Sequence, residues 1–408
     1  MTHTPIASKN GTPRIVVLGA GYGGIVTVQR LQKLLRPGEA SVTLVSKHDY
    51  HYVTAHLHMP AAGTDRLESA RVSIASLIDP KRTRFVRSAV RRIDPKRRVV
   101  ELESGTLEYD VLVVGLGGEP ETFGIPGVAE HAMNIRSLNT VRRIREHIEM
   151  SFETFKREPH RTELLTFVVV GAGFTGTEFV GELADRLPVL CKKYGVDPSL
   201  VKLYNIEASP TALPPGFPPE LVRYGMNVLS RKGVVYKLAS PIRECRPDGV
   251  LLNGGEFIPA GTVVWAGGVR GNRLLEEAGF ETSRGQVAVD LYLRSPQFAN
   301  VYVIGDCSLV VGLDGKRVPS TGQLAVQQGA YLARCLAASV RGEKAEPFVY
   351  RHQGTVASLG KGAAVGVVGS RILYGYVASL LKKLIDMRYL YLIGGIPLVL
   401  RKGVFKTD

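Results

Sequence analysis

Two glycine-rich turns contain the first residues of this chain that could take part in chemistry. In the first turn, Gly19, Gly21 and Gly24 follow an apolar run at 15–18 and precede a helical pattern. The first glycine of such a turn allows a sharp bend, the second lets the backbone approach a pyrophosphate, and the third lets helix and strand pack closely. The start of the helix offers free N–H groups and a partial positive charge to the phosphates. The turn therefore predicts a bound dinucleotide.

The second turn repeats this pattern. Gly171, Gly173 and Gly176 again lie between an apolar run at 165–170 and a helical pattern. One such motif is a weak signal, but two copies in one chain are far more specific. Hydride transfer needs two such partners, because one donates the hydride and the other accepts it. The two turns together predict an oxidoreductase with two dinucleotides.

The residue at the end of the next strand distinguishes the two sites. In the second unit the run 201–207 ends at Glu207, where a carboxylate would accept from the ribose 2′-hydroxyl and repel a 2′-phosphate. This favours NADH over NADPH, and a strand-end glutamate on the surface is the alternative. In the first unit the matching residues are Ser46 and Lys47, so no acid is present. The adenosine contacts of a flavin therefore stay open there, and the lysine could reach a cofactor phosphate instead.

A further acidic residue follows a later strand. Asp306 ends the run 300–306, directly after Gly305. A carboxylate in that position could hold the ribityl hydroxyls of a flavin. The alternative is an ordinary turn aspartate.

These sites need a particular architecture to position them. Each turn joins a strand to a helix, as a dinucleotide-binding unit begins, and the run 300–306 resembles the end of the first unit. We predict an α/β fold with two Rossmann-like dinucleotide-binding domains, for FAD and NAD, plus a C-terminal membrane-binding segment. A helix at 135–155 would link the two units. The predicted domains are 12–140 with 284–347 for FAD, 162–283 for NADH, and 348–408 for membrane anchoring and dimer contacts.

Composition narrows the class of protein. The chain has 408 residues, of which 45% are hydrophobic and 22% charged, as in a soluble globular protein. Its net charge of +15 predicts an anionic partner, whether nucleic acid, lipid or cofactor. The polar residues 1–10 predict no signal peptide. No window reaches the roughly 18 apolar residues of a spanning helix, because the longest apolar run, 389–400, contains two glycines and a proline.

The cysteines give no redox motif. Cys191, Cys245, Cys307 and Cys335 form no CxxC pair or close spacing. We therefore expect neither a disulfide framework nor a sequence-local dithiol active site.

Longer motifs are similar to those of one family, the type II NADH dehydrogenases, which are NADH:quinone oxidoreductases that do not pump protons. The similarity covers the chain from about Arg14 to Lys402. It implies a respiratory-chain enzyme that passes hydride from NADH to FAD and two electrons to a membrane quinone, and it implies homodimers. The motifs are DYHYVTAHLHMPAAG from Asp49, PETFGIPG from Pro120, GAGFTGTEFVGELADR from Gly171, VWAGGVRGN from Val264 and GQLAVQQG from Gly322.

The resemblance also assigns roles to residues. The quinone motif AQxAxQ of the family reads Gly322-Gln323-Leu-Ala325-Val-Gln327 here, with glycine replacing the first alanine. Two uncharged amides one helical turn apart suit the carbonyls of a quinone. The resemblance places Glu178 beside the flavin, as a carboxyl that relays protons. For the glutamines, the alternative is an ordinary helix with two polar residues. For Glu178, the alternative is an acidic residue near a helix N-terminus, where the helix dipole stabilises it.

The complete set of predicted site residues follows from the motifs and the resemblance together. The catalytic residues are Glu178, Gln323 and Gln327, and the two glutamines also bind the quinone. The FAD contacts are Gly19, Ala20, Gly21, Tyr22, Gly23, Gly24, Ser46, Lys47, Thr54, Val90, Gly117, Asp306 and Lys382. The NADH contacts are Gly171, Gly173, Phe174, Thr175, Gly176, Glu178, Glu207 and Gly267. We predict no metal, because the clustered His48, His51, His56 and His58 have no HExxH motif or cysteine partner; this stretch would instead cover the flavin.

The C-terminal stretch 374–405 predicts an amphipathic helix. Such a helix suits an anionic membrane surface, and a core or dimer helix is the alternative. The family resemblance favours peripheral attachment, on the cytoplasmic face of the cell membrane, and Lys382 would reach the flavin from this helix. Its apolar residues are Leu380, Leu381, Leu384, Ile385, Leu390 and Leu392, and its basic ones Lys382, Lys383 and Arg388, followed by Arg401, Lys402 and Lys406.

Two other functions remain as alternatives. A sulfide:quinone oxidoreductase shares the expected fold, but its chemistry needs a cysteine pair that the spacing does not supply. A nucleotide-sensing or DNA-binding flavoprotein would use the basic stretch 81–98, which contains a single aromatic residue, Phe85, to stack on bases. We therefore expect NADH, a quinone and a membrane surface as partners, and no nucleic acid.

Overall fold

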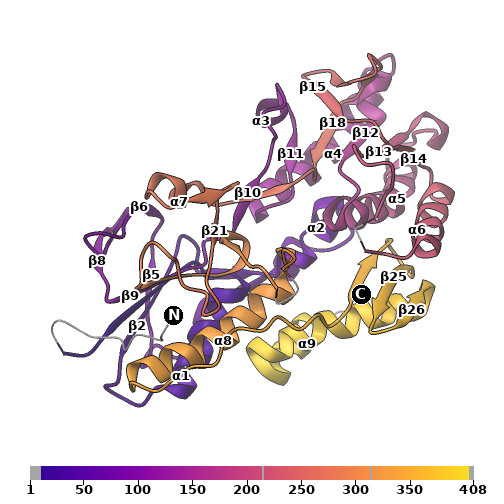
Figure 1. Ribbon diagram of the computed structural model, residues 1–408. Helices are drawn as coiled ribbons and strands as arrows, with labels where there is room; N and C mark the ends of the chain where they lie inside the picture. The colour runs from indigo at the N-terminus through magenta and orange to yellow at the C-terminus, as the bar shows by residue number, and fades with distance from the viewer. Residues whose placement is uncertain (1–10, 214–215, 313–314, 404–408) are drawn as a thin grey trace.

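The computed structural model describes residues 11–213, 216–312 and 315–403. The predictions for residues 1–10 and for Lys406 lie outside the described residues. In Figure 1 one dinucleotide-binding unit lies at the left and the second at the upper right, with the long helix α9 along the lower edge.

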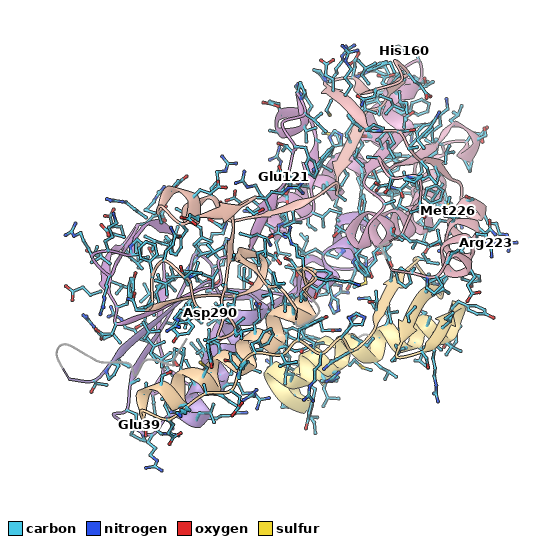
Figure 2. All side chains as sticks on the ribbon, in the orientation of Figure 1. Glu39, Glu121, His160, Arg223, Met226 and Asp290 are labelled. Atoms are coloured by element: carbon cyan, nitrogen blue, oxygen red, sulfur yellow. The ribbon has the colours of Figure 1, made fainter. Side chains whose placement is uncertain are left out.

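The first unit is built on a five-stranded parallel sheet in the order β22-β9-β1-β2-β5. Helix α1 (Tyr22–Leu34) follows β1, and α8 (Gly322–Val340) lies beside α1. The two helices meet closely, since a side chain at Gly329 would collide with the carbonyl of Gly23. An ion pair of 2.9 Å between Arg341 and Glu39, at the lower left of Figure 2, joins their ends. The strands are β1 (Arg14–Leu18), β2 (Ser41–Ser46), β5 (Arg84–Arg87), β9 (Val111–Val114) and β22 (Val301–Val303).

The second unit repeats this design with the sheet order β11-β18-β12-β13-β14, again parallel. The second glycine turn lies between strand β12 and helix α5. Parallel strands buried on both faces read as continuous apolar runs, and β12 is buried at every position. The elements are β11 (Met133–Asn134), β12 (Thr166–Val170), β13 (Lys202–Ile206), β14 (Val234–Lys237), β18 (Thr262–Trp265), α4 (Leu138–Arg157), α5 (Phe174–Tyr194) and α6 (Pro219–Arg231).

Each unit also carries a three-stranded antiparallel sheet, which lies in the chain before β9 in the first unit and before β18 in the second. In the first unit it is β6 (Val90–Asp94), β7 (Val99–Leu102) and β8 (Gly105–Glu108); in the second it is β15 (Ile242–Arg246), β16 (Gly249–Leu252) and β17 (Phe257–Pro259). In the basic stretch, β5 belongs to the parallel sheet, and β6 and β7 pair as an antiparallel hairpin. The remaining short elements are β3 (Tyr50–Tyr52), α2 (His58–Ala62), β4 (Arg71–Ser73), α3 (Val128–His131), α7 (Arg273–Glu277), β20 (Thr282–Ser283), β21 (Gln286–Ala288) and β23 (Ser308–Leu309).

A pair of short antiparallel strands joins the two units. Strand β10 (Gly118–Pro120) pairs antiparallel with β19 (Val269–Gly271). The indole N–H of Trp265 donates to the carbonyl of Glu121 over 2.8 Å, and Glu121 lies between the units in Figure 2. The expected helix at 135–155 is α4, which begins at Leu138 because Ser137 and Thr140 form a capping box.

The C-terminal region packs on both units. A three-stranded sheet of β24 (Thr355–Ser358), β25 (Ala364–Val368) and β26 (Arg371–Tyr374) precedes α9 (Gly375–Lys402). Helix α9 kinks at Gly395, whose φ of 64° is non-helical. It binds the first unit through the side chain of Gln29, which donates to the Ile393 carbonyl over 2.6 Å. Of the helices in the described residues, none has the length and apolar character needed to cross a membrane.

Candidate active site

The first glycine turn has the shape needed to hold a pyrophosphate. A side chain at Gly19, whose φ is 97°, would collide with the Gly115 carbonyl, and one at Gly24 would collide with the Gly19 carbonyl. A Cβ at Gly21 would meet nothing within 4 Å, and no side chain caps the start of α1 there. The backbone N–H groups of this helix end are therefore open to an anion at Gly21, which fits a dinucleotide cofactor.

The second turn has the same geometry. Gly171 has a φ of 95° and lies against Ala266, Gly176 lies against the Gly171 carbonyl, and Gly173 faces open space. The N–H of Gly171 donates to Ile206 O over 2.7 Å, as that of Gly19 donates to Val45 O over 2.8 Å. These two bonds align the units residue by residue. They make Ser46 the structural equivalent of Glu207.

Glu207 lies directly on the second turn. Its Oε2 accepts from the backbone N–H of Ala172 over 2.7 Å, and its Oε1 accepts from that of Ser209 over 2.9 Å. Ala172 is the residue between the first two glycines, so the carboxylate lies where a ribose bound at this turn would be. In the first unit the Ser46 hydroxyl accepts from the N–H of His48 over 3.3 Å, and Lys47 is exposed.

The turn that carries Asp306 is held by a buried amide. Gln328 Oε1 accepts from the Gly305 N–H over 2.7 Å, and its Nε2 donates to the Ser308 hydroxyl over 2.9 Å. Asp306 itself lies 3.6 Å from Arg136. The sequence interpretation missed Gln328. The available signal was its place on the apolar stripe of α8 with Leu324 and Tyr331, where a glutamine must find buried partners.

The other predicted cofactor residues lie around the two turns. The Tyr22 hydroxyl accepts from the N–H of Ala55, next to Thr54, over 3.2 Å. Gly117 has a φ of 75°, and its carbonyl accepts from the Cys307 thiol over 3.1 Å. Of the other predicted contacts, Val90 begins β6, and Phe174 and Thr175 begin α5. Gly267 lies against the Trp265 ring.

A buried cluster of charged groups lies between the two turns. Lys382 Nζ of α9 is 3.6 Å from Glu178 Oε1 of α5 and 3.3 Å from Asp386 Oδ1. His56 Nε2 is 3.3 Å from Asp386 Oδ2, and His58 Nδ1 is 3.7 Å from Glu178 Oε2. Glu178 also accepts from the backbone N–H of Ser358 over 3.1 Å. The structure therefore brings together Glu178 and Lys382, which the sequence assigned separately.

The charges in this cluster stabilise one another against burial. Burial opposes the charged ammonium, but the carboxylates of Glu178 and Asp386 raise the pKa of Lys382 above its ordinary value. Burial likewise disfavours the Asp386 carboxylate, yet Lys382 and His56 lower its pKa to about 2. Burial lowers the pKa of His58. The resulting group combines a fixed ammonium, a fixed carboxylate and a neutral imidazole.

Helix α9 also contacts the first glycine turn. The rings of Tyr22 and Tyr389 lie 4.5 Å apart, and the Tyr389 hydroxyl is 2.8 Å from His51 Nε2. His51 Nδ1 lies 2.8 Å from the carbonyl of Ala20, and because a carbonyl only accepts, Nδ1 carries the proton. Burial lowers the pKa of His51 to about 4. The predicted histidine cluster is thus divided, with His51 on the turn and His56 and His58 in the charged cluster.

The two motif glutamines hold a neighbouring segment. Gln327 Nε2 donates to Arg351 O over 2.8 Å, and its Oε1 accepts from the Arg351 N–H over 3.0 Å. Gln323 Oε1 accepts from the Tyr350 hydroxyl and the Gln353 N–H, and its Nε2 donates to Gly354 O over 3.3 Å. Both amide oxygens are therefore occupied by protein. Gly322 is not required sterically, because a Cβ there would lie 3.6 Å from the Tyr22 ring.

The apolar residues of α9 do not all face solvent. Leu390 is 1% exposed and packs with Ile393 and Leu398 in the core of the first unit, so its assignment to the membrane face was wrong. Lys382 is also buried, 16% exposed, rather than flanking that face. The exposed apolar face comprises Tyr376, Val377, Leu380, Leu384, Ile385, Tyr391, Leu392, Ile396 and Leu400, which we call the α9 ridge.

The cysteines and the basic stretch give little support to the two alternative functions that the sequence left open. All four cysteines are buried free thiols, and burial raises the pKa of Cys307 to about 12 and those of Cys245 and Cys335 to about 11, which disfavours the nucleophilic thiolate. In the basic stretch, Arg92 lies 3.3 Å from Glu101, and Arg91 also pairs with Glu103. Within the described part of the chain, no three His, Cys, Asp or Glu side chains are grouped to hold a metal ion.

Comparisons with known proteins match this geometry. The family model for pyridine nucleotide-disulphide oxidoreductases matches residues 13–329. The type II NADH:quinone oxidoreductase of Staphylococcus epidermidis is 42% identical over 397 residues, and that of Staphylococcus aureus is 41% identical; each match covers 96% of this chain and 98% of the relative. The structure of NDH2 from Plasmodium falciparum in complex with NADH superposes with a TM-score of 0.84 at 17% identity, covering 96% of this chain and 97% of that one. The sulfide:quinone oxidoreductase of Aquifex aeolicus superposes with a TM-score of 0.75 at 20% identity, covering 97% and 96%.

Proposed function

Since the chain belongs to the type II NADH:quinone oxidoreductases, we propose that its two glycine turns divide the reaction between FAD and NADH. The chain is a flavoprotein that oxidises NADH and reduces a quinone. Bound FAD takes hydride from NADH and passes two electrons to the quinone. The turn at Gly19–Gly24 would hold FAD, and the turn at Gly171–Gly176 would hold NADH. The observation that carries this division is the difference at one pair of equivalent residues, because the second turn has the carboxylate of Glu207 beside it and the first has Ser46.

The two units differ in how they treat the adenosine ribose. Glu207 presents a carboxylate beside the second turn, which suits the free 2′-hydroxyl of NADH. Ser46 and Lys47 at the equivalent place would leave the FAD ribose to a hydroxyl and a cation. Asp306, held by Gln328, would take the ribityl hydroxyls of the flavin. The domain limits 12–140 with 284–347, 162–283 and 348–408 are part of this proposal.

The charged cluster would serve the quinone half of the reaction. Reduction of a quinone by NADH takes up one proton from water, and a buried carboxyl beside the acceptor is suited to supply it. Glu178 would take this role, and Lys382, 3.6 Å away, would fix its orientation. Each of the amide nitrogens of Gln323 and Gln327 donates one bond to the segment 350–354. The second N–H of each is left to donate to a quinone carbonyl.

The α9 ridge would bring the enzyme to its quinone. It exposes large apolar side chains along most of the helix, and Arg388 and Arg401 are exposed on the same helix. Asp386 is the only acidic residue between Gly375 and Lys402, and it is buried in the cluster. A helix of this kind binds an anionic membrane through buried apolar area and about 1 kcal/mol per basic residue near the surface.

We extend the same proposal to assembly and location. The enzyme would lie peripherally on the cytoplasmic face of the cell membrane as a homodimer. Two α9 ridges on one face would bind more strongly than one, because the first contact raises the effective concentration of the second. Analytical ultracentrifugation of the purified protein tests the dimer directly.

Half-reactions measured separately test the proposed function. The purified yellow protein should be bleached anaerobically by NADH, poorly by NADPH and not by sulfide. Addition of a quinone should then restore the colour. Bleaching by sulfide would refute the assignment of NADH as the donor in the first half-reaction. Bleaching by NADH without reoxidation by any quinone would refute the assignment of the second half-reaction.

A further inference from the structure

Lys382 is bound from two sides in the buried cluster. Its ammonium lies 3.6 Å from Glu178 and 3.3 Å from Asp386, and the side chains of Lys382 and Asp386 are only 16% and 13% exposed. Asp386 lies one helical turn after Lys382 on α9, so the pair forms within one rigid element. On its other side, Asp386 is 3.3 Å from His56. The nearer partner of the lysine is thus the carboxylate on its own helix, Asp386.

The two carboxylates beside Lys382 differ in how steadily they carry a negative charge. A buried ammonium with a single counter-ion remains costly to keep charged. If Glu178 exchanges protons with a quinone, its negative charge is present only part of the time. Lys382 then needs a second anion that stays charged throughout, and Asp386 supplies it.

We propose that Asp386, which lies 3.3 Å from His56, is a positioning residue that keeps the Lys382 ammonium fixed beside Glu178 during quinone reduction. The inference rests on the role proposed above for Glu178 and Lys382, and extends it to Asp386 and His56. Asp386 acts through the lysine and does not touch the quinone.

The surroundings of Lys382 support this role. The groups that face it are Glu178 from α5, Asp386 from its own helix, His58 from α2 and Tyr22 from α1, with His56 behind Asp386. Burial raises the pKa of Tyr22 and lowers that of His58, so both stay neutral near pH 7. The two carboxylates therefore provide the only negative charges among these groups.

The test compares Asp386→Asn with Asp386→Glu and Asp185→Asn in the full-length holoenzyme. Asp185 pairs with Lys232 over 2.8 Å, at a similar degree of burial, outside the cluster, so Asp185→Asn is a matched control for loss of an ion pair. Flavin reduction by NADH and reoxidation by a soluble ubiquinone analogue are measured by anaerobic stopped flow from about pH 6 to about pH 10.

We expect Asp386→Asn to reduce flavin at the parental rate, within about twofold. Its reoxidation rate should decline within the measured range, by about tenfold or more at the highest pH, whereas the parental rate should hold there, because Lys382 loses its proton earlier in the variant. Asp386→Glu should restore the parental profile, and Asp185→Asn should keep it. His56→Gln, which leaves the carboxylate in place, should move the profile in the same direction by less.

The outcomes separate this inference from the function beneath it. If Glu178→Gln and Lys382→Met slow reoxidation but neither Asp386→Asn nor His56→Gln moves its pH profile, the positioning role is wrong. If Glu178→Gln and Lys382→Met leave reoxidation unchanged, the proposed role of the cluster fails first. Where Asp386→Asn does not retain FAD, His56→Gln decides the question, and an unchanged profile there overturns the inference.

Discussion

Replacement of Glu207 by glutamine tests the choice of nucleotide most directly. Each carboxylate oxygen of Glu207 accepts one backbone N–H, from Ala172 over 2.7 Å and from Ser209 over 2.9 Å. A glutamine keeps one acceptor oxygen, and its amide nitrogen would then oppose the second N–H as donor against donor. The substitution also removes the negative charge that would repel a 2′-phosphate.

Two effects of different size follow from this geometry. Loss of the bond to Ala172 would loosen the turn itself, at a cost of about 1–3 kcal/mol, and it would weaken both nucleotides alike. Loss of the charge acts on the two nucleotides in opposite directions. The ratio of kcat/KM for NADH to that for NADPH cancels the first effect, and we expect this ratio to fall roughly 5- to 150-fold, the equivalent of about 1–3 kcal/mol.

The assay is steady-state turnover with each nucleotide at saturating quinone. Glu244→Gln is the matched control, because Glu244 lies in the same unit, is a partly exposed carboxylate and pairs only with Arg246 over 2.8 Å at the surface. It should leave the ratio unchanged. An unaltered NADH to NADPH ratio in Glu207→Gln would show that this carboxylate does not recognise the ribose.

Three further perturbations have expected outcomes. Gln323→Leu and Gln327→Leu should slow reoxidation by quinone while NADH still bleaches the flavin at the parental rate, and equal loss in both half-reactions would instead reflect release of the segment 350–354. Leu400→Ser, at a position that is 71% exposed, should weaken sedimentation with anionic liposomes and leave the Tm unchanged. Leu390→Ser, in the core, should instead cost about 2–5 kcal/mol of stability. The membrane role of the ridge is refuted if Leu400→Ser, combined with Ile396→Ser, sediments like the parent. Because burial lowers the pKa of His51 from 6.5 to about 4, its neutral form stabilises the fold above pH 6.5. That contribution, about 3 kcal/mol, should be lost as the pH falls towards 4, so urea unfolding at pH 7 and about pH 4.5 should differ less in His51→Gln than in the parent.

The sequence alone determined the two glycine turns and the order of the units around them. The constraint at each turn is local, because a side chain at Gly24 would collide with the carbonyl of Gly19 only five residues earlier. The strand that ends at Glu207 follows within the same unit, so simple strand and helix patterns were enough to place it. The α/β class followed from the same local patterns.

The tertiary structure decided which face of α9 meets the protein. This helix is apolar on most sides, so its periodicity could not separate Leu390, which packs on the first unit, from Leu400, which is exposed. Which of these leucines is buried depends on how α9 packs against α1 and on the kink at Gly395. For the same reason the periodicity counted Lys382 among the basic residues of a membrane helix, and only the family resemblance expected it to reach the flavin; in the structure it lies in the buried cluster.

The sequence also could not predict polar contacts between residues that lie far apart in the chain. Glu178 and Lys382 lie on different helices far apart in the chain, and no local pattern relates them. The motif glutamines hold the segment 350–354, and the adjacent Gln328 holds the turn of Asp306. A local motif identifies residues whose backbone must bend in a given way, but a buried charge or amide is defined by the partners that the packed units bring to it, and these exist only once the chain is folded.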